Sequence, residues 1–409
     1  MDLIKLNKSH KESFEKLLKF SFPPEDEEET EWINIFFKNE KIWNDAYGWF
    51  DEDGVLVSTY SSYSGQYMIR DEAFHVKFIE NVATLPPYRN KGLIRKGLKK
   101  ELEDNYDSKF NFFCLGPFKH EFYRKIGFET ATDSRSLKID FDFFSKKLDF
   151  RGYRTKIGLM KQDSNLRDDI DLVKQWFWDH SRYNHGKYPE VFIETGIQMT
   201  SHYVAVAYDE KSVPKGYMVF SEKDQMLKIL IMNYIDLQSF FALKQLLLSY
   251  QDQVKGIKFV NIPPDFPIDL LIDNFWLTGK KLSLEDNGWH MFRIVNLEKV
   301  LIKICKKFPY KDIYLKVSDN VLDKNNGIFH FSKNKIERVE SNSGKIDAEI
   351  LISDIVPLVT GRKSAFELYL TGKLTIPGKG TIYNSKNLAP QIIAELDKIF
   401  PKVNTLSLG

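Results

Sequence analysis

Residues 82–94 read VATLPPYRNKGLI, and this stretch decides the fold. The pattern predicts a strand that ends at two prolines, followed by a tight turn into an amphipathic helix over residues 91–106. The first amides of a helix lack intrahelical partners and carry its positive dipole end, so this turn is a candidate anion site. Gly92 lets the backbone approach a ligand, and Arg89 and Lys91 add charge suited to a pyrophosphate. The alternative is an ordinary strand–helix connection with solvated basic residues.

The first 150 residues alternate strand and helix patterns around this stretch. Two β-rich runs are joined by the acidic turn 51–54, which is typical of a hairpin. The expected strands cover residues 2–6, 43–50, 55–63, 74–85 and 110–115. One expected helix begins at a cap on Ser9, and further helices are expected over 27–38, 91–106 and 118–125, the last of them stopped by Gly127.

Two further units are expected after residue 150. Residues 151–295 repeat the order of the first unit, but no Arg-x-x-Gly segment lies between Tyr234 and Leu243. This middle unit therefore reads as a degenerate copy that has lost the anion site. Residues 296–409 have polar-faced strands and short helices typical of an α+β unit. The predicted domains are 1–150, 151–295 and 296–409.

Composition excludes several classes of protein. The 59 Lys and Arg against 57 Asp and Glu leave a net charge of +2, so no global field for nucleic acid exists. No run of about 18 apolar residues is present, which excludes a spanning helix. Two separated cysteines, Cys114 and Cys305, and the lack of a secretory pattern predict a cytoplasmic protein. The histidines are scattered, so no metal site is expected.

A second block, residues 112–129, reads FFCLGPFKHEFYRKIGFE. Together with the Arg89–Gly92 turn, 31 residues before Tyr123, it resembles the GNAT acyltransferase superfamily and its Eis-like branch. The turn is similar to the acetyl-CoA pyrophosphate loop, and residues 122–128 are similar to the block near the thiol. Ile94 stands where the broad superfamily has a small residue, but it matches the bulky residue of Eis-like members.

The resemblance implies the architecture of the whole chain. It implies two tandem GNAT-like domains of mixed α/β and α+β class, the second degenerate, followed by a sterol-carrier-protein-like α+β domain. The last unit is indicated by residues 355–370. The cosubstrate acetyl-CoA would be bound by residues of the strand and turn: Val82, Ala83, Thr84, Arg89, Asn90, Lys91, Gly92, Leu93 and Ile94.

The resemblance also implies direct attack of an amine on the thioester. Tyr123 is the expected general acid for the departing thiolate, with a half-buried packing residue as the alternative. Two groups compete as general base. Eis-like proteins are inferred to use the C-terminal carboxylate, here Gly409, which the sequence slightly favours. Glu80, on the strand leading into Val82, is the rival, and otherwise a solvated strand-edge charge.

Residues 25–31 contain six acidic side chains in seven positions. Such runs are often solvated helix faces. The functional interpretation is a negative, aromatic-walled mouth for amines, with Phe22, Asp26 and Trp32 as candidate acceptor residues.

The sequence thus predicts an acetyl-CoA-dependent N-acetyltransferase that acts on a primary amine of a cationic acceptor: an aminoglycoside-like molecule, a polyamine or lysine. The alternative is a non-catalytic acyl-CoA or lipid sensor. Eis-like proteins assemble as trimers, often paired to hexamers, so a homo-oligomer is expected. The C-terminal unit reads as a scaffold that delivers the chain terminus, or else as a lipid tunnel.

Overall fold

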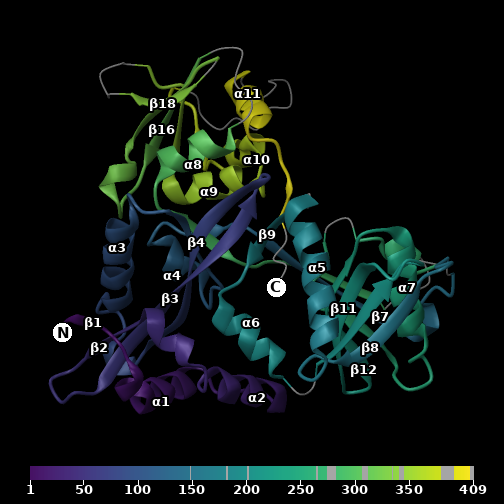
Figure 1. Cartoon of the computed structure of the whole chain (residues 1–409). Helices are drawn as coiled ribbons and strands as arrows, with labels where there is room; N and C mark the ends of the chain where they lie inside the picture. The colour runs from purple at the N-terminus through teal and green to yellow at the C-terminus, as the bar shows by residue number, and fades with distance from the viewer. Residues whose placement is uncertain are drawn as a thin grey trace.

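The computed structural model describes residues 1–147, 149–180, 183–199, 202–263, 266–273, 282–305, 312–333, 335–339, 345–378 and 391–405. Three β-sheets with their helices form three lobes (Figure 1). The first, in purple and blue, lies beside the teal second lobe and below the green and yellow third lobe. This confirms the predicted mixed fold class of two similar units followed by a smaller α+β unit.

The first sheet carries the decisive stretch on its fourth strand. β4 pairs antiparallel with β3 and parallel with β5. At its outer side, β9 (Tyr183–Lys187) pairs with β3, and β21 (Asn404–Thr405) pairs with β9. Apart from β9 and β21, the strands of the first sheet lie side by side in the order β1 (Leu3–Lys5), β2 (Ala46–Phe50), β3 (Leu56–Ile69), β4 (Glu72–Thr84), β5 (Phe110–Leu115), β15 (Met291–Ile294) and β6 (Glu129–Thr130).

The helices of this lobe occupy the predicted regions with shifted ends. They are α1 (Lys11–Ser21), α2 (Glu27–Phe36), α3 (Leu93–Asn105) and α4 (His120–Arg124). Ser9 is not a helix cap: the side chain of Asn7 caps the short 3-10 turn Lys8–His10, which precedes α1. Asparagine and serine are both favoured helix caps, so the sequence does not show whether Asn7 or Ser9 is the cap, and the backbone conformation decides it.

The second sheet repeats this order. Its parallel pair β12–β13 corresponds to β4–β5, with α7 (Leu237–Leu248) between the two strands in sequence as α3 is in the first lobe. α5 (Ser164–His180) and α6 (Glu190–Ile197) precede β10. The strand order is β14 (Leu282–Gly288), β7 (Asp133–Asp140), β13 (Gly256–Phe259), β12 (Met226–Tyr234), β11 (Pro214–Lys223), β10 (Tyr203–Tyr208) and β8 (Arg154–Leu159).

The two sheets exchange strands. β7 precedes residue 150 in sequence but pairs with β13 and β14 of the second sheet, whereas β15 from the end of the middle segment pairs with β5 and β6 of the first. The proposed boundaries at residues 150 and 295 therefore divide the sequence but not the sheets.

The N-terminus of α7 explains the missing anion site of the second unit. Asp236 caps this helix: its carboxylate accepts from Ser239 N at 2.8 Å, and the Ser239 hydroxyl completes a capping box. Its other carboxylate oxygen accepts from the Tyr153 hydroxyl at 2.9 Å. A carboxylate at this position neutralises the helix dipole and repels a diphosphate.

The third sheet runs in the order β18 (Ile336–Val339), β17 (Gly327–Phe331), β16 (Ile313–Ser318), β19 (Ala348–Leu351) and β20 (Leu374–Thr375). Its helices are α8 (Leu297–Ile304), α9 (Ile352–Thr360), α10 (Ala365–Leu370) and α11 (Gln391–Ile399). One hydrophobic core joins this unit to the first sheet, since Phe74, Phe112 and Phe292 cluster with Leu301 and Val356. The C-terminal unit is therefore fused to the first lobe. None of the described helices has the length and apolar run needed to cross a membrane.

A buried ion pair ties these lobes together. Arg293 on β15 and Asp319 after β16 are both fully buried, with the Arg293 Nη2 atom 2.5 Å from Asp319 Oδ2. Arg293 Nε also donates to the carbonyl of Ile126 at 3.0 Å, at the end of the α4 segment. Each of the three guanidinium nitrogens donates a hydrogen bond, and together with the ion pair these bonds offset the cost of burying the charge.

We expect Arg293→Met to lower the free energy of unfolding by about 3–5 kcal/mol, because it leaves Asp319 buried without its cation. Urea unfolding measures this change. The control is Lys316→Met, which removes a half-exposed pair with Glu349 and should leave the free energy of unfolding nearly unchanged. Equal effects of the two substitutions would contradict this account.

Candidate active site

β4 and β5 are hydrogen-bonded along nearly all of β5 but along only the first part of β4. Their register runs from His75 opposite Phe110 to Phe78 opposite Cys114, and β5 ends at Leu115 whereas β4 continues to Thr84. At the carboxyl end of the sheet β4 therefore extends beyond its parallel partner. In open sheets with parallel strands this is where ligands bind.

A bulge in β4 lies just beyond this pairing. Ser61 pairs with Glu80 and Thr59 with Ala83, so two β4 residues lie opposite one residue of β3. Asn81 has a left-handed backbone, with φ of 55°, and its side-chain amide nitrogen Nδ2 donates to Ser61 Oγ at 3.1 Å. A bulge leaves backbone groups unpaired and bends the strand. Here it re-aims the stretch from Glu80 to Val82.

The turn after β4 leaves the N-terminus of α3 open. Gly92 is the N-cap residue, with φ of 76° and no side-chain capping bond, and the first helical bond runs from Lys96 N to Gly92 O at 2.9 Å. A Cβ atom at Gly92 would meet nothing within 4 Å. Among the described residues, the amides of Leu93, Ile94 and Arg95 have neither a helical nor a side-chain partner at this terminus, and the space beside Gly92 is open.

The basic residues of the turn are exposed beside these amides. Arg89 Nε donates to the carbonyl of Thr84 at 3.1 Å, and the Lys91 ammonium lies 4.6 Å from the centre of the Tyr88 ring. Asn90 is exposed with φ of 61°. Ala83, Leu93 and Ile94 are predicted cosubstrate residues whose side chains are 4%, 8% and 5% exposed. These three residues are largely buried, and we expect their backbone groups to make most of their contacts with a ligand.

A cavity of about 290 Å³ lies next to the bulge. It joins the end of β4 to α1, α2, α4 and α6. Five predicted residues line it, Phe22, Trp32, Glu80, Val82 and Tyr123, together with Leu18, Lys19, Glu29, Ile33, Phe36, Phe37, Ile79, Asn81, Gly116, Phe118 and Phe192. Sequence positions from 18 to 192 thus meet at one point.

Tyr123 lies on α4 and is only 1% exposed, with its ring against Phe118, Phe122 and Phe128 at 5.5, 5.0 and 5.9 Å between centres. It still lines the cavity. Burial, and then the nearby charge of Glu80, raises the pKa of the phenol above its usual value. Among the described residues no hydrogen bond to its hydroxyl is found. The group is therefore protonated and available to a ligand.

Glu80 faces the same cavity from the end of β4. Burial raises its pKa to about 7, because a carboxylate loses solvation in this apolar surrounding. Within the described chain its carboxylate also lacks a hydrogen-bond partner. A carboxyl group with a pKa near neutral is suited to accept a proton.

The loop that ends α4 is fixed from below. Gly127 has φ of 87°, and a Cβ there would lie 2.7 Å from Arg293 Nε. The glycine of the second block is therefore required both for its backbone conformation and for the space that Arg293 fills.

Asp26 does not line the cavity. Its carboxylate caps α2 by accepting from Glu29 N at 2.9 Å and pairs with Lys223 at 2.5 Å. The hydrogen bond with Lys223 lowers the pKa of this exposed group. Glu29, one turn along α2, is the acidic residue on the cavity wall.

Four aromatic residues of the cavity wall were not predicted from the sequence: Phe36, Phe37, Phe118 and Phe192. Phe192 on α6 stacks on Phe36 and Trp32, with ring centres 5.9 and 6.1 Å apart. Phe36 lies one helical turn after Trp32, so the apolar stripe of α2 contained its signal. Phe192 had no local signal, because it comes from the middle unit.

Gly409 lies outside the described residues. The described end of the tail, β21, runs parallel to β9, and β9 runs antiparallel to β3. Since Ser61 of β3 pairs with Glu80, β21 runs along the first sheet in the direction of Glu80.

Comparisons with known proteins agree with this geometry. The model of the acetyltransferase (GNAT) domain matches residues 2–131, and that of the sterol carrier protein domain matches residues 301–406. The first unit is a GNAT N-acetyltransferase domain, and the chain has the Eis-like architecture. No curated protein gives a significant sequence match.

Three solved structures match this chain over nearly its full length. A probable N-acyltransferase from Enterococcus faecalis has a TM-score of 0.81 at 18% identity, covering 100% of this chain and 98% of its own. A GCN5-related N-acetyltransferase from Anabaena variabilis has 0.80 at 16%, covering 99% and 98%. Eis1 from Mycobacterium abscessus has 0.76 at 16%, covering 100% and 99%. At such identities these likenesses establish the fold alone.

The GNAT family implies an acyl-CoA cosubstrate, and the described residues fit one. An uncapped helix terminus with basic neighbours suits a diphosphate, and the stretch of β4 beyond β5 leaves backbone groups for a pantetheine arm. No three His, Cys, Asp or Glu side chains gather at a metal-binding distance in the described part of the chain.

We expect Gly92→Ala to raise the KM for acetyl-CoA about tenfold, because a methyl group would stand over the open amides and strain the turn. Steady-state kinetics measures it. Gly54→Ala is the matched control: Gly54 has the same φ of 76° and equally open surroundings, but lies in the β2–β3 hairpin. It should lose similar stability and keep its KM. A raised KM in both variants would assign the effect to backbone strain.

Proposed function

We propose that the chain transfers an acetyl group from acetyl-CoA to a primary amine of a cationic acceptor by direct attack. The observation that carries this proposal is one cavity with two ionisable groups, Glu80 and Tyr123, that have no hydrogen-bond partner among the described residues. A proton acceptor and a proton donor face the same small space. Amine transfer needs both groups, whereas a sensor needs neither.

Each residue has a defined role. Glu80 takes a proton from the incoming ammonium group, which frees the nitrogen lone pair for attack. Acetyl-CoA, when bound, supplies a carbonyl carbon activated by its thioester bond. Tyr123 donates its proton to the sulfur as the C–S bond breaks, and the second proton of the attacking nitrogen, released as the amide forms, restores the phenol. The backbone amides of the α3 turn, together with Arg89 and Lys91, hold the diphosphate. Fixing both reactants in one cavity supplies much of the acceleration.

The cavity walls support a cationic acceptor. Trp32, Phe36 and Phe192 present stacked rings, and Glu29 adds a carboxylate. Aromatic faces attract ammonium groups, and a carboxylate at the mouth adds Coulomb attraction. A volume of about 290 Å³ admits one slender amine-bearing arm, such as a polyamine end or a lysine side chain. An aminoglycoside would insert one amine-bearing portion and leave the rest outside.

Glu80 is the base that the described residues support, since its pKa of about 7 lies well above that of an ordinary α-carboxyl group, roughly 3.3–3.7. Gly409 stays the second candidate because β21 runs in the direction of Glu80. Assembly into trimers or hexamers remains an inference from the Eis-like architecture.

We expect kcat/KM to rise with pH and to reach a plateau above about pH 7, because only the ionised Glu80 accepts a proton and its pKa is raised to about 7. Glu80→Gln should lower kcat about 100-fold and remove this limb of the profile. Thiol release from acetyl-CoA with a polyamine as acceptor measures both.

Removal of residues 407–409 separates the two candidate bases. Turnover that survives this truncation and is lost in Glu80→Gln assigns the base to Glu80. Turnover that is lost on truncation and retained in Glu80→Gln assigns it to the tail carboxylate and refutes the proposed role of Glu80.

Glu29→Gln should raise the KM for a cationic amine about two- to fivefold and leave the KM for acetyl-CoA unchanged, because it removes an attraction at the partly solvated mouth. Glu27→Gln is the control, since Glu27 belongs to the same acidic run but does not line the cavity. If both substitutions have the same effect, the run acts as a diffuse field and not as a pocket wall.

A further inference from the structure

The helix that carries Tyr123 is too short to hold its own position. α4 has five residues, from His120 to Arg124, and its N-cap Lys119 makes no side-chain capping bond. A single turn of helix is unstable by itself. Contacts made by its neighbours must therefore fix the direction of the Tyr123 hydroxyl.

Glu129 makes the strongest of these contacts on the outer side. Arg124, the residue after Tyr123, donates from Nε and Nη2 to the two Glu129 oxygens, each at 2.9 Å. The Thr130 amide adds a bond to Oε1 at 2.9 Å. Burial alone would raise the pKa of Glu129, but the bonds from Arg124 and its other donors lower it to about 2. A fork-to-fork pair of this kind fixes orientation as well as distance.

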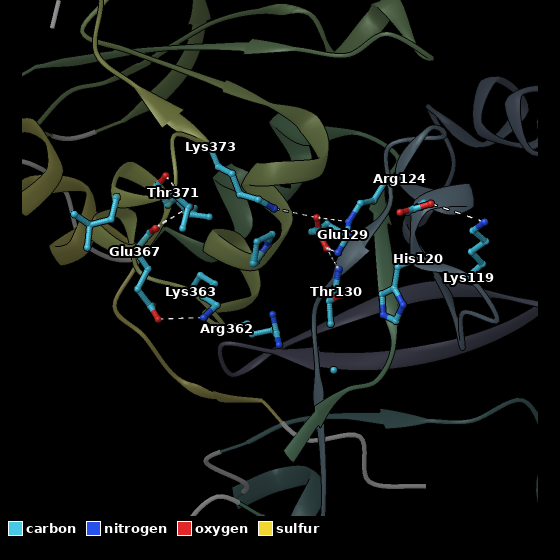
Figure 2. Close-up of a pocket in the computed structure, with 15 residues that line it drawn as sticks. Lys119, His120, Arg124, Glu129, Thr130, Arg362, Lys363, Glu367, Thr371 and Lys373 are labelled. Atoms are coloured by element: carbon cyan, nitrogen blue, oxygen red, sulfur yellow. Dashed lines mark hydrogen bonds and ion pairs between the residues drawn. The ribbon is translucent and has the colours of Figure 1, made fainter. Parts of the chain in front are cut away.

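The remaining donor to Glu129 comes from the C-terminal unit. Lys373, just before β20, places its ammonium group 3.1 Å from Glu129 Oε2 and 3.0 Å from Asp354 Oδ1 on α9. Figure 2 shows Lys373 and Arg124 reaching Glu129 from opposite sides. Two linked ion pairs, from Lys373 to Glu129 and from Glu129 to Arg124, thereby connect the sterol-carrier-like unit to α4.

A second connection to the C-terminal unit lies on the inner side of α4, where Arg293 joins the Ile126 carbonyl to Asp319 and Tyr123 shares a core with Val321 and Leu322. On the outer side the two units are farther apart. An open cavity of about 1070 Å³ separates the outer face of α4 from α10 and the end of α9. His120 and Arg124 line one wall, and Arg362, Lys363 and Lys373 line the other. Over this area the two units meet through charged side chains and not through packed apolar ones.

We propose that Lys373 is a positioning residue for acetyl transfer: through Glu129 and Arg124 it fixes α4 so that Tyr123 meets the departing sulfur. This inference rests on the proposed role of Tyr123 as proton donor. It gives the C-terminal unit a part in the reaction that requires neither a lipid nor the chain terminus.

The test is Lys373→Met in the full-length protein, assayed for kcat, for the KM of acetyl-CoA and for the unfolding midpoint. We expect kcat to fall about tenfold, because small displacements of a reacting group are costly, with the KM of acetyl-CoA unchanged within about twofold. Lys373→Arg should restore most of kcat. Lys363→Met is the matched control: Lys363 lines the same cavity with similar exposure but pairs with Glu367 inside its own unit.

A Tyr123→Phe background identifies the route. Tyr123→Phe alone should lower kcat strongly, and adding Lys373→Met should then change kcat by less than about twofold, because both substitutions remove one function. A full additional loss in that background, or normal kcat in Lys373→Met alone, would overturn the positioning role while the acid role of Tyr123 stands. Full activity of Tyr123→Phe would instead refute the acid role, and the inference with it.

If Lys373→Met unfolds at the assay temperature, Asp354→Asn tests the same connection from its far side. It weakens the hold on Lys373 and keeps every group on α4. The proposal is supported if Asp354→Asn lowers kcat by less than the tenfold expected of Lys373→Met, leaves the KM of acetyl-CoA constant and has no effect in the Tyr123→Phe background. An unchanged kcat contradicts it.

Discussion

The extension of β4 beyond its parallel partner is the constraint on which the active site depends. β4 and β5 are paired up to Phe78 and Cys114, β5 ends at Leu115, and the bulge at Asn81 then bends β4. If the pairing continued, the sheet would be closed at its carboxyl end and the space beside Glu80 would be filled. The open N-terminus of α3 and the buried phenol of Tyr123 become useful because this gap lies between them.

Features encoded within one short stretch could be predicted from the sequence. Gly92 before an apolar helix face is a local pattern that predicts an open helix terminus, and the role expected of Tyr123 came from the resemblance of residues 122–128 to the GNAT block near the thiol. The burial that raises the pKa of Glu80 is not local, because it depends on elements up to α6. Asp26 shows the opposite limit: an acidic run identifies a helix start, but not which carboxylate faces the cavity and which one caps the helix.

The three units contribute different things to one site. The first supplies Glu80 and Tyr123, the second supplies the ring of Phe192 on the cavity wall, and the third holds Arg293 through Asp319. None of these long-range contacts can be recognised from the sequence around the Arg89–Gly92 turn or from residues 112–129. A short helix with a critical side chain is made rigid here by parts of the chain that take no part in the chemistry, which is a common way to achieve preorganisation.

The exchange of β7 and β15 has a consequence for synthesis. The edge of β5 receives its neighbour only when residues 291–294 have been made, some 160 residues after β6. At bacterial and eukaryotic elongation speeds this delay amounts to roughly ten to thirty seconds. During that interval a hydrophobic strand edge leaves the ribosome without its partner, and such edges invite aggregation. The topology therefore leaves this edge of β5 unpaired for much of the synthesis of the chain.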